Sequence, residues 1–273
     1  MTNGGATAHL PLRGLRVLDL GDFIAAPYCA RLLADAGADV LKVEPPGGDS
    51  ARRAGPFPGD RPDPDGGALN AFVNRGKRSV TLDTATDAGR RTLGNLIERA
   101  DVLVHDFASP AASPLGLDAD AMLARYPRLV TASITPFGES GPYRDLRADD
   151  LVTMAMSGLA FATPGFPDYA VDPETEPPLR PNAYVAEFVG GLMGAVGATM
   201  ALINRLTTGL GDYVEVSKQE AVACMLSWDQ AMYSYGGNVV GRRQSSAGLG
   251  PNNYLPCADG WMVIVAFMDN HWR

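Results

Sequence analysis

Histidine and cysteine are scarce in this chain, and their scarcity limits the chemistry that it can support. Its 273 residues contain three histidines: His9, His105 and His271. A zinc site or a Ser-His-Asp triad therefore has little material to work with. His105 is expected at the end of a strand, where a structural role is the favoured interpretation. The cysteines also number three, Cys29, Cys224 and Cys257. Their spacing is neither paired nor of a metal-binding type, which predicts reduced thiols and no metal site.

Long apolar runs, an export signal and excess positive charge are also absent. Residues 183–203 come closest to a membrane span, but they contain Glu187 and four glycines. The first residues, MTNGG, have neither a basic flank nor an apolar segment, so they predict no secretory signal. The net charge of −8 argues against a general nucleic-acid binder, so a polyanionic ligand must meet a local cluster of basic residues. We expect a cytoplasmic protein with neither a membrane nor a nucleic acid as partner.

The first 140 residues alternate between short β-branched runs and helical stretches, a pattern typical of a parallel sheet covered by helices. Strands are predicted at residues 16–20, 39–44, 79–83, 101–105 and 129–134. Helices are predicted at 27–36, 86–99, 117–126, 150–161, 183–206 and 217–235, with a turn and a short strand at 209–216. The segment at residues 45–67 is too long for an ordinary connection, so we predict that it is either a functional loop or partly disordered.

A hairpin is predicted near the end of the chain, at residues 254–267, with its turn at Asp259 and Gly260. An isolated hairpin is not stable on its own, so we expect it to open a second, smaller domain within which the chain ends.

Glu187 is the residue at which chemistry is most strongly indicated. It lies inside an apolar, small-residue run, where a carboxylate is either desolvated or opens into a pocket. The glycines at 190, 191, 194 and 197 each cost a helix roughly 1 kcal/mol relative to alanine, so close packing or a ligand must compensate. The alternative interpretation is an acid on a solvent-facing side of the helix, with no role beyond solubility.

Several collinear motifs identify a resemblance to a known family. They include LRGLRVLDLGDFIAAP at 12–27, LADAGADVLKVEP at 33–45, NRGKRSVTLD at 74–83, FGESGPY at 137–143 and RLTTGLGDYVEVS at 205–217. In these motifs the chain resembles the class III CoA-transferases, the CaiB/BaiF type, whose members include formyl-CoA transferase and α-methylacyl-CoA racemase. The resemblance implies a large CoA-binding α/β domain at residues 1–240, with a Rossmann-like parallel sheet flanked by helices. Residues 241–273 would then be a linker and the first hairpin of a truncated small domain.

The resemblance also implies an activity and a site. These enzymes move CoA from an acyl-CoA to a carboxylic acid acceptor through an enzyme-bound acyl anhydride and then an enzyme-bound CoA thioester. Their nucleophile is an aspartate, and the matching position is Glu187, which would form a glutamyl-CoA thioester. No tightly bound cofactor is implied, since CoA is part of the substrate. The implied CoA site comprises Phe23, Ile24, Leu82, Asp106, Phe107 and Arg147, and the implied thioester contacts are Gly190 and Gly191.

Some positions depart from the family pattern. Asp106 stands where relatives commonly carry asparagine, and Pro114, Ala85 and Pro45 stand where basic residues can occur. Each lost cation removes a contact to a CoA phosphate worth about 1.5–3 kcal/mol. For Lys77 and Arg78, CoA contact and a surface role remain alternatives.

Two alternatives to a catalytic transferase concern the function, and a separate expectation concerns the assembly. A racemase would carry a His-Asp pair where this chain has Asp149 and Asp150, so it would lack one of its two bases and is disfavoured. A non-catalytic homologue, or the structural subunit of a hetero-oligomeric transferase, remains open. Family members form interlocked dimers, so we expect a homodimer, or a heteromer with a homologous subunit, and an exposed apolar surface on the isolated chain.

Overall fold

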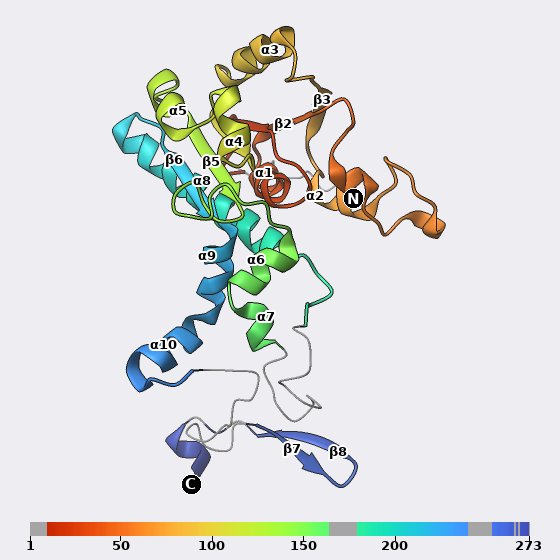
Figure 1. Ribbon diagram of the computed structural model, residues 1–273, viewed down its shortest axis with the longest axis vertical. Helices are drawn as coiled ribbons and strands as arrows, with labels where there is room; N and C mark the ends of the chain where they lie inside the picture. Colours follow the sequence, from red (N-terminus) through yellow and green to blue (C-terminus); the bar gives the residue numbers. More distant parts are fainter. Residues whose placement is uncertain (1–9, 164–178, 240–252, 265, 267, 273) are drawn as a thin grey trace, which may run out of the picture.

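The computed structural model describes residues 10–163, 179–239, 253–264, 266 and 268–272 (Figure 1). Its centre is a six-stranded parallel sheet in the order β3-β2-β1-β4-β5-β6. The strands are β1 Arg16–Asp19, β2 Asp39–Glu44, β3 Arg78–Thr81, β4 Val102–His105, β5 Val130–Thr135 and β6 Tyr213–Ser217. This is the strand order of the Rossmann fold, which reverses direction between β1 and β4. The predicted α/β class is therefore confirmed.

Helices cover both faces of the sheet because alternate strand residues point to opposite sides. Val17 and Val102 pack in one cluster with helices at Ala25–Asp35 and Val185–Thr208, whereas Leu18 and Leu103 pack in another with helices at Asp87–Ile97 and Ala119–Arg125. The helices before β6 are α1 Ala25–Asp35, α2 Ala68–Val73, α3 Asp87–Ile97, α4 Ser109–Ala112, α5 Ala119–Arg125, α6 Asp150–Met156, α7 Leu159–Ala162 and α8 Val185–Thr208. After β6 follow α9 Lys218–Ala223 and α10 Ser227–Gly236.

Two predicted helices are each divided in the structure. The one at 150–161 becomes α6 and α7, because Gly158 between them has a φ of 90°, which a helix cannot accommodate. The one at 217–235 becomes α9 and α10, joined by a 3-10 turn at Cys224–Leu226. The short helices α2 and α4 were not predicted.

The glycines of α8 allow close packing, as the sequence required. A Cβ at Gly194 would lie 2.4 Å from Ile134 Cδ1 of β5, and one at Gly197 would lie 2.5 Å from Val214 Cγ1 of β6. The helix therefore lies almost directly on the sheet. By length and composition α8 could also cross a membrane, but half of its apolar window is buried within this fold, as in a core helix.

The long loop after β2 is held by ion pairs. It contains short 3-10 helices at Ser50–Arg53 and Pro58–Asp60. Arg52 binds both carboxylate oxygens of Glu44, at 2.6 and 2.8 Å, and also contacts Asp65 at 2.7 Å. These contacts return the loop to the end of β2, where its residues can contribute to a site.

The predicted hairpin is present as β7 Asn253–Cys257 paired with β8 Gly260–Ile264, and Phe267 lies outside the described residues. The domain boundary at 240 and 241 also falls outside them and stays a prediction.

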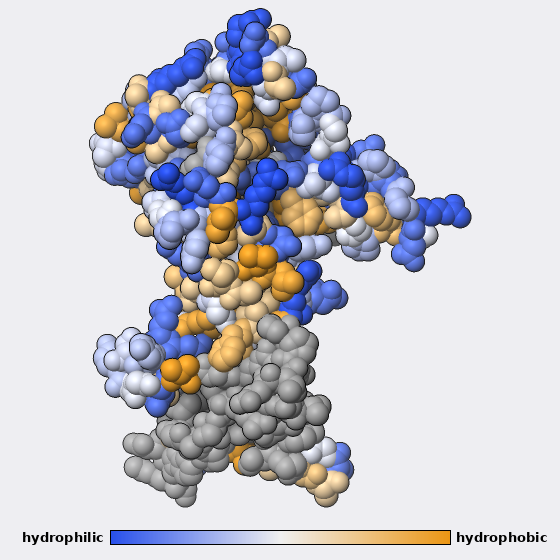
Figure 2. All heavy atoms as spheres, viewed as in Figure 1, coloured by the Kyte–Doolittle hydropathy of each residue, from blue (hydrophilic) through white to orange (hydrophobic). Residues whose placement is uncertain are grey.

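Apolar side chains reach the surface on several helices. Figure 1 shows α6, α7, α9 and α10 extending away from the sheet, and Figure 2 shows apolar atoms exposed around them. On α8, an exposed strip at helical spacing comprises Leu192, Val196, Met200 and Ile203.

Candidate active site

The carboxyl edge of the sheet carries a cavity of about 340 Å³. Its walls come from the loops after β1, β2, β3 and β4, which include Gly21, Gly48, Thr84 and Phe107. Open α/β folds bind ligands at this edge, near the point where the strand order reverses. The cavity therefore lies where this fold would hold a ligand.

The cavity gathers only part of the predicted CoA site. Leu82 and Phe107 line it, together with Asp22 of the first loop. Arg147 is exposed on the loop before α6 and is not among the lining residues. Arg53, which the sequence analysis did not single out, lines the cavity and donates to the Gly47 carbonyl oxygen at 3.0 Å. Its position in the unusually long loop was the available signal.

Phe23 and Ile24 lie in the loop after β1, but they are not among the residues that line the cavity. Phe23 has a φ of 63°, which is rare for a residue with a side chain and marks local strain. Its ring packs edge-on against Tyr184, with centroids 5.0 Å apart, and its N–H donates to Asp49 Oδ1. Ile24 is completely buried beside these rings. The two residues direct the chain into α1, and their predicted contact with CoA is left as a prediction.

Glu187 is 6% exposed and lies in the first turn of α8. Its Oε2 accepts a hydrogen bond from the N–H of Ala25, the first residue of α1, at 3.2 Å. Its Oε1 lies 2.5 Å from the ammonium nitrogen of Lys218. Helix N-termini and ammonium groups both attract negative charge, so both contacts hold the carboxyl group of Glu187 in place.

Lys218, the first residue of α9, is a residue of the candidate site that the sequence analysis missed. It is only 6% exposed and follows directly after β6. The chain has three lysines against 20 arginines, and the other two are Lys42 and Lys77. A rare lysine directly after a predicted strand was the available signal.

Two further carboxyl groups, those of Asp150 and Asp106, are affected by the charge of Glu187. Asp150 Oδ1 accepts from the N–H groups of Ala186 and Glu187, at 2.7 and 3.2 Å, and so caps the start of α8. Its Oδ2 has no hydrogen-bond partner among the described residues. Burial raises the pKa of Asp150, and the charge of Glu187 raises it further against the lowering effect of the two N–H bonds.

Asp106 interacts with the cavity residue Asp22 and with the charges of Glu187 and Lys218. Its Oδ2 accepts from the N–H of Asp22 at 2.9 Å. Burial raises the pKa of Asp106 to about 8, the charge of Glu187 acts in the same direction, and Lys218 opposes both. Its carboxyl group is therefore mostly protonated at neutral pH.

Comparison with known families matches residues 12–273 to CoA-transferase family III. The chain belongs to this family. It is 36% identical over 267 residues to succinyl-CoA:mesaconate CoA-transferase of Haloarcula hispanica, covering 96% of this chain and 65% of that protein. It is 38% identical to the succinyl-CoA–L-malate CoA-transferase beta subunit of Chloroflexus aurantiacus, covering 97% and 64%. The chain thus spans just under two thirds of the length of these relatives.

A solved structure agrees with this assignment. The CaiB/BaiF family protein from Brucella suis superimposes with a TM-score of 0.79 at 31% identity, over 95% of this chain and 67% of that one. The resemblance drawn from the motifs is confirmed.

In this family III chain, Gly190 and Gly191 face other parts of the protein. A Cβ at Gly190 would lie 2.6 Å from Lys218 Cγ, and one at Gly191 would lie 2.4 Å from the Ala25 carbonyl oxygen. Both glycines therefore let Glu187 approach its partners closely. Their contact with a thioester stays a prediction.

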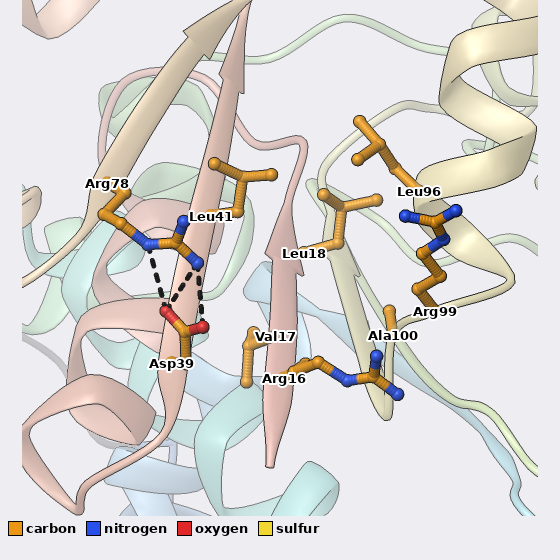
Figure 3. Close-up of a pocket in the computed structure, with 9 residues that line it drawn as sticks. All are labelled: Arg16, Val17, Leu18, Asp39, Leu41, Arg78, Leu96, Arg99 and Ala100. Carbon is orange, nitrogen blue, oxygen red and sulfur yellow. Dashed lines mark hydrogen bonds and ion pairs between the residues drawn. The ribbon is translucent and has the colours of Figure 1, made fainter. Parts of the chain in front are cut away.

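Lys77 and Arg78 do not line the cavity. Lys77 is buried and binds Asp19 Oδ2 at 2.8 Å beneath the first loop. Arg78 pairs with Asp39 at 2.7 Å at the opposite, amino edge of the sheet, beside a second hollow shown in Figure 3. Its side chain is 69% exposed, which favours the surface role.

Lys42 joins Lys77 in a buried ionic cluster under the loop after β1. Its Nζ contacts Asp49 Oδ2 at 2.6 Å and the Gly21 carbonyl oxygen at 2.8 Å. Burial acts to lower the pKa of Lys42, but the charges of Asp19 and Asp49 outweigh it, so the net direction is upward. The cluster connects the loop after β1 with the loop after β2, and both loops line the cavity.

His105 is an interior residue. It is fully buried, its Nε2 lies 3.4 Å from Tyr213 Oη, and burial lowers its pKa to about 4. Within the described residues, no cluster of His, Cys, Asp or Glu side chains is arranged to hold a metal ion.

Proposed function

We propose that the protein containing this chain is an acyl-CoA:carboxylate CoA-transferase in which Glu187 is the nucleophile. The observation that carries the proposal is the buried Glu187 carboxylate, held by an ammonium and a helix N-terminus in a family III fold. The residue singled out by its apolar surroundings and the position matched to the family nucleophile are the same residue.

The reaction proceeds at Glu187 in four steps. The carboxylate attacks the thioester carbonyl, CoA leaves as its thiolate, and a mixed anhydride forms. The thiolate then attacks Cδ of Glu187, which releases the first acid as a carboxylate and leaves a glutamyl-CoA thioester. The acceptor carboxylate attacks the same carbon and expels CoA again. Finally, CoA attacks the acceptor's acyl carbon, which releases acyl-CoA and restores Glu187.

The cavity is the proposed site for the nucleotide part of CoA. Leu82 and Phe107 offer apolar contact for the adenine, and Arg53 offers a cation for a phosphate. Asp106, being mostly protonated at neutral pH, places no full negative charge beside that phosphate.

Phe107→Ala should weaken CoA binding about tenfold or more, because stacking on an aromatic face contributes about 1–3 kcal/mol per base at nucleic-acid sites. Isothermal titration calorimetry with CoA measures the change. Tyr143→Ala, which removes an exposed aromatic ring outside the cavity, is the matched control. Equal affinity of Phe107→Ala and the unaltered protein would place the nucleotide elsewhere.

Succinyl-CoA is the donor to test first. Relatives of 31–38% identity are named as transferases between succinyl-CoA, or succinate, and mesaconate, glutarate, malate or citramalate. The proposed substrates are accordingly short dicarboxylic acids and their CoA thioesters.

After incubation with succinyl-CoA, Glu187 should carry an adduct that hydroxylamine or borohydride traps and mass spectrometry locates. Glu187→Gln should abolish it, since an amide is a poor nucleophile. Glu187→Asp tests whether the length of the side chain limits turnover. A strong rise in turnover would show that the longer glutamate side chain holds the carboxylate away from its best position. The absence of adduct in both the unaltered protein and Glu187→Asp, with CoA still bound, would refute the transferase proposal and favour a non-catalytic subunit.

A subunit role in a larger assembly is the second candidate. Two relatives are named as alpha and beta subunits of one transferase. The exposed apolar strip on α8 supports an assembly, as a homodimer or with a homologous subunit, since such strips are usually covered. We also propose a cytoplasmic location, with which the free state of all three cysteines agrees.

A further inference from the structure

The geometry points to Lys218 as a second catalytic residue, whose ammonium stabilises the negative charge that develops on Oε1 when the CoA thiolate attacks Cδ of Glu187. This inference rests on the proposed function and assigns Lys218 to one of its steps. Three observations carry it: the unequal contacts of the two carboxylate oxygens, the space made for the lysine, and the position of Oε1 in the reaction.

The two oxygens of Glu187 are held differently. Oε1 is 2.5 Å from an ammonium, whereas Oε2 is 3.2 Å from the backbone N–H of Ala25. Both bonds are charge-assisted, but the ammonium carries a full positive charge at a shorter distance, whereas the backbone N–H carries only a partial one. The charge of Oε1 is therefore the more neutralised, and Oε2 is the better nucleophile toward the thioester.

Burying this lysine costs hydration free energy and requires a glycine beside its stem. Its side chain is 7% exposed, so the ammonium gives up hydration that a surface lysine would keep. Its stem passes over Gly190, where any larger residue would bring a Cβ to 2.6 Å from Lys218 Cγ. Among the described residues, the one carboxylate within ion-pair distance of the ammonium is Glu187. A structural lysine could be placed without these demands.

In the second step, the attack of the thiolate on Cδ of Glu187, the negative charge develops on Oε1. When Oε2 bonds to the acyl carbon, Oε1 becomes the carbonyl oxygen of Glu187 and still faces Lys218. The thiolate sulphur then bonds to Cδ, and the carbonyl π pair moves onto Oε1. Collapse of this intermediate re-forms the carbonyl, breaks the Cδ–Oε2 bond and releases the acid with Oε2 as one of its oxygens. No proton moves, so Lys218 remains an ammonium throughout.

The same contact serves the third step. When the acceptor carboxylate attacks the glutamyl-CoA thioester, the charge again develops on Oε1 and the CoA thiolate leaves. Lys218 therefore acts in the two steps at Cδ of Glu187, and not in the two steps at the acyl carbon of donor or acceptor.

This division makes the inference testable by rapid-quench mass spectrometry with succinyl-CoA. The mass added to the Glu187 peptide distinguishes a succinyl adduct, formed first, from a CoA adduct, formed second. In Lys218→Met, the first step should be slowed less than the second, because the attacking oxygen Oε2 keeps its contact with the Ala25 N–H, so the succinyl adduct should accumulate. The CoA adduct should form about a hundredfold more slowly, the loss typical when one oxyanion donor is removed.

Three further variants complete the experiment. Lys218→Gln is a second neutral variant, which keeps a hydrogen-bond donor if Lys218→Met does not fold. Lys218→Arg keeps the charge and should recover part of the rate of CoA-adduct formation. Arg180→Met removes a neighbouring cation that stacks on Tyr184 without contacting Glu187, and it should leave both rates unchanged.

The outcomes separate the two levels of the proposal. CoA-adduct formation at the original rate in both neutral variants, or equal slowing of both adducts, would overturn the role of Lys218 while leaving Glu187 as nucleophile. Absence of any adduct in the unaltered protein would instead overturn the proposed function, and the role of Lys218 with it.

Discussion

Lys42→Met should lower the free energy of unfolding by about 3–5 kcal/mol, the range found when one partner of a buried ion pair is removed. Lys42 is 1% exposed, and its ammonium contacts Asp49 at 2.6 Å and Asp19 at 3.6 Å. Methionine fills a similar volume, so the loss comes from the buried carboxylates that remain without this cation. Urea unfolding at neutral pH measures the change.

A matched control lies on the neighbouring strand. Arg78→Met breaks the exposed pair with Asp39 at the opposite edge of the same sheet (Figure 3). Water screens that pair, so the expected loss is about 0.2–1 kcal/mol. Equal losses for the two variants would mean that the ionic cluster under the first loop contributes no more than a surface pair.

Asp106→Asn should make the protein progressively more stable than the unaltered chain as pH rises from about 4 to about 8. The pKa of Asp106 is about 8 in the folded protein against an ordinary value of 3.8, chiefly because of burial. Between these values the folded state keeps a proton that the unfolded state has lost, so stability falls as pH rises. Each unit of pKa difference corresponds to about 1.4 kcal/mol, so the effect over the whole range amounts to several kcal/mol.

The measurement is the free energy of unfolding of both proteins at several pH values in this range. Asparagine is neutral throughout, so the difference between the proteins should grow with pH and vanish toward pH 4. Asp145→Asn, on an exposed loop, controls for the loss of one carboxyl group. A difference that does not vary with pH would contradict the raised pKa.

Asp106 also explains a departure from the family pattern. The resemblance drawn from the motifs implies asparagine at this position, and a protonated aspartate has the same shape and no net charge. At neutral pH the substitution therefore preserves the electrostatic character of the site. The sequence shows which residue is present, but its protonation state depends on burial and on Glu187 and Lys218.

The sheet could be predicted because its signals are local. The inner parallel strands are short buried runs, and β1 to β5 appear at nearly the predicted residues, although the edge strand β3 is exposed. The division of the helix at 150–161 was missed because a single glycine in a sequence is as compatible with a buried helix as with a bend, and its positive φ is known only from the structure. The helices α2 and α4 are too short for periodicity to reveal them.

Glu187 could be found from sequence alone, because a carboxylate in an apolar run is unfavourable unless something compensates. The sequence by itself determined the family, the parallel α/β sheet and this one candidate nucleophile, since each depends on residues close together in the chain. Only the tertiary structure decided what compensates. It brings the start of α1, 162 positions away, and Lys218, 31 positions away, to the two oxygens of Glu187. Those contacts arise because the carboxyl ends of parallel strands meet at one edge, so the helices that follow β1 and β6 both begin there.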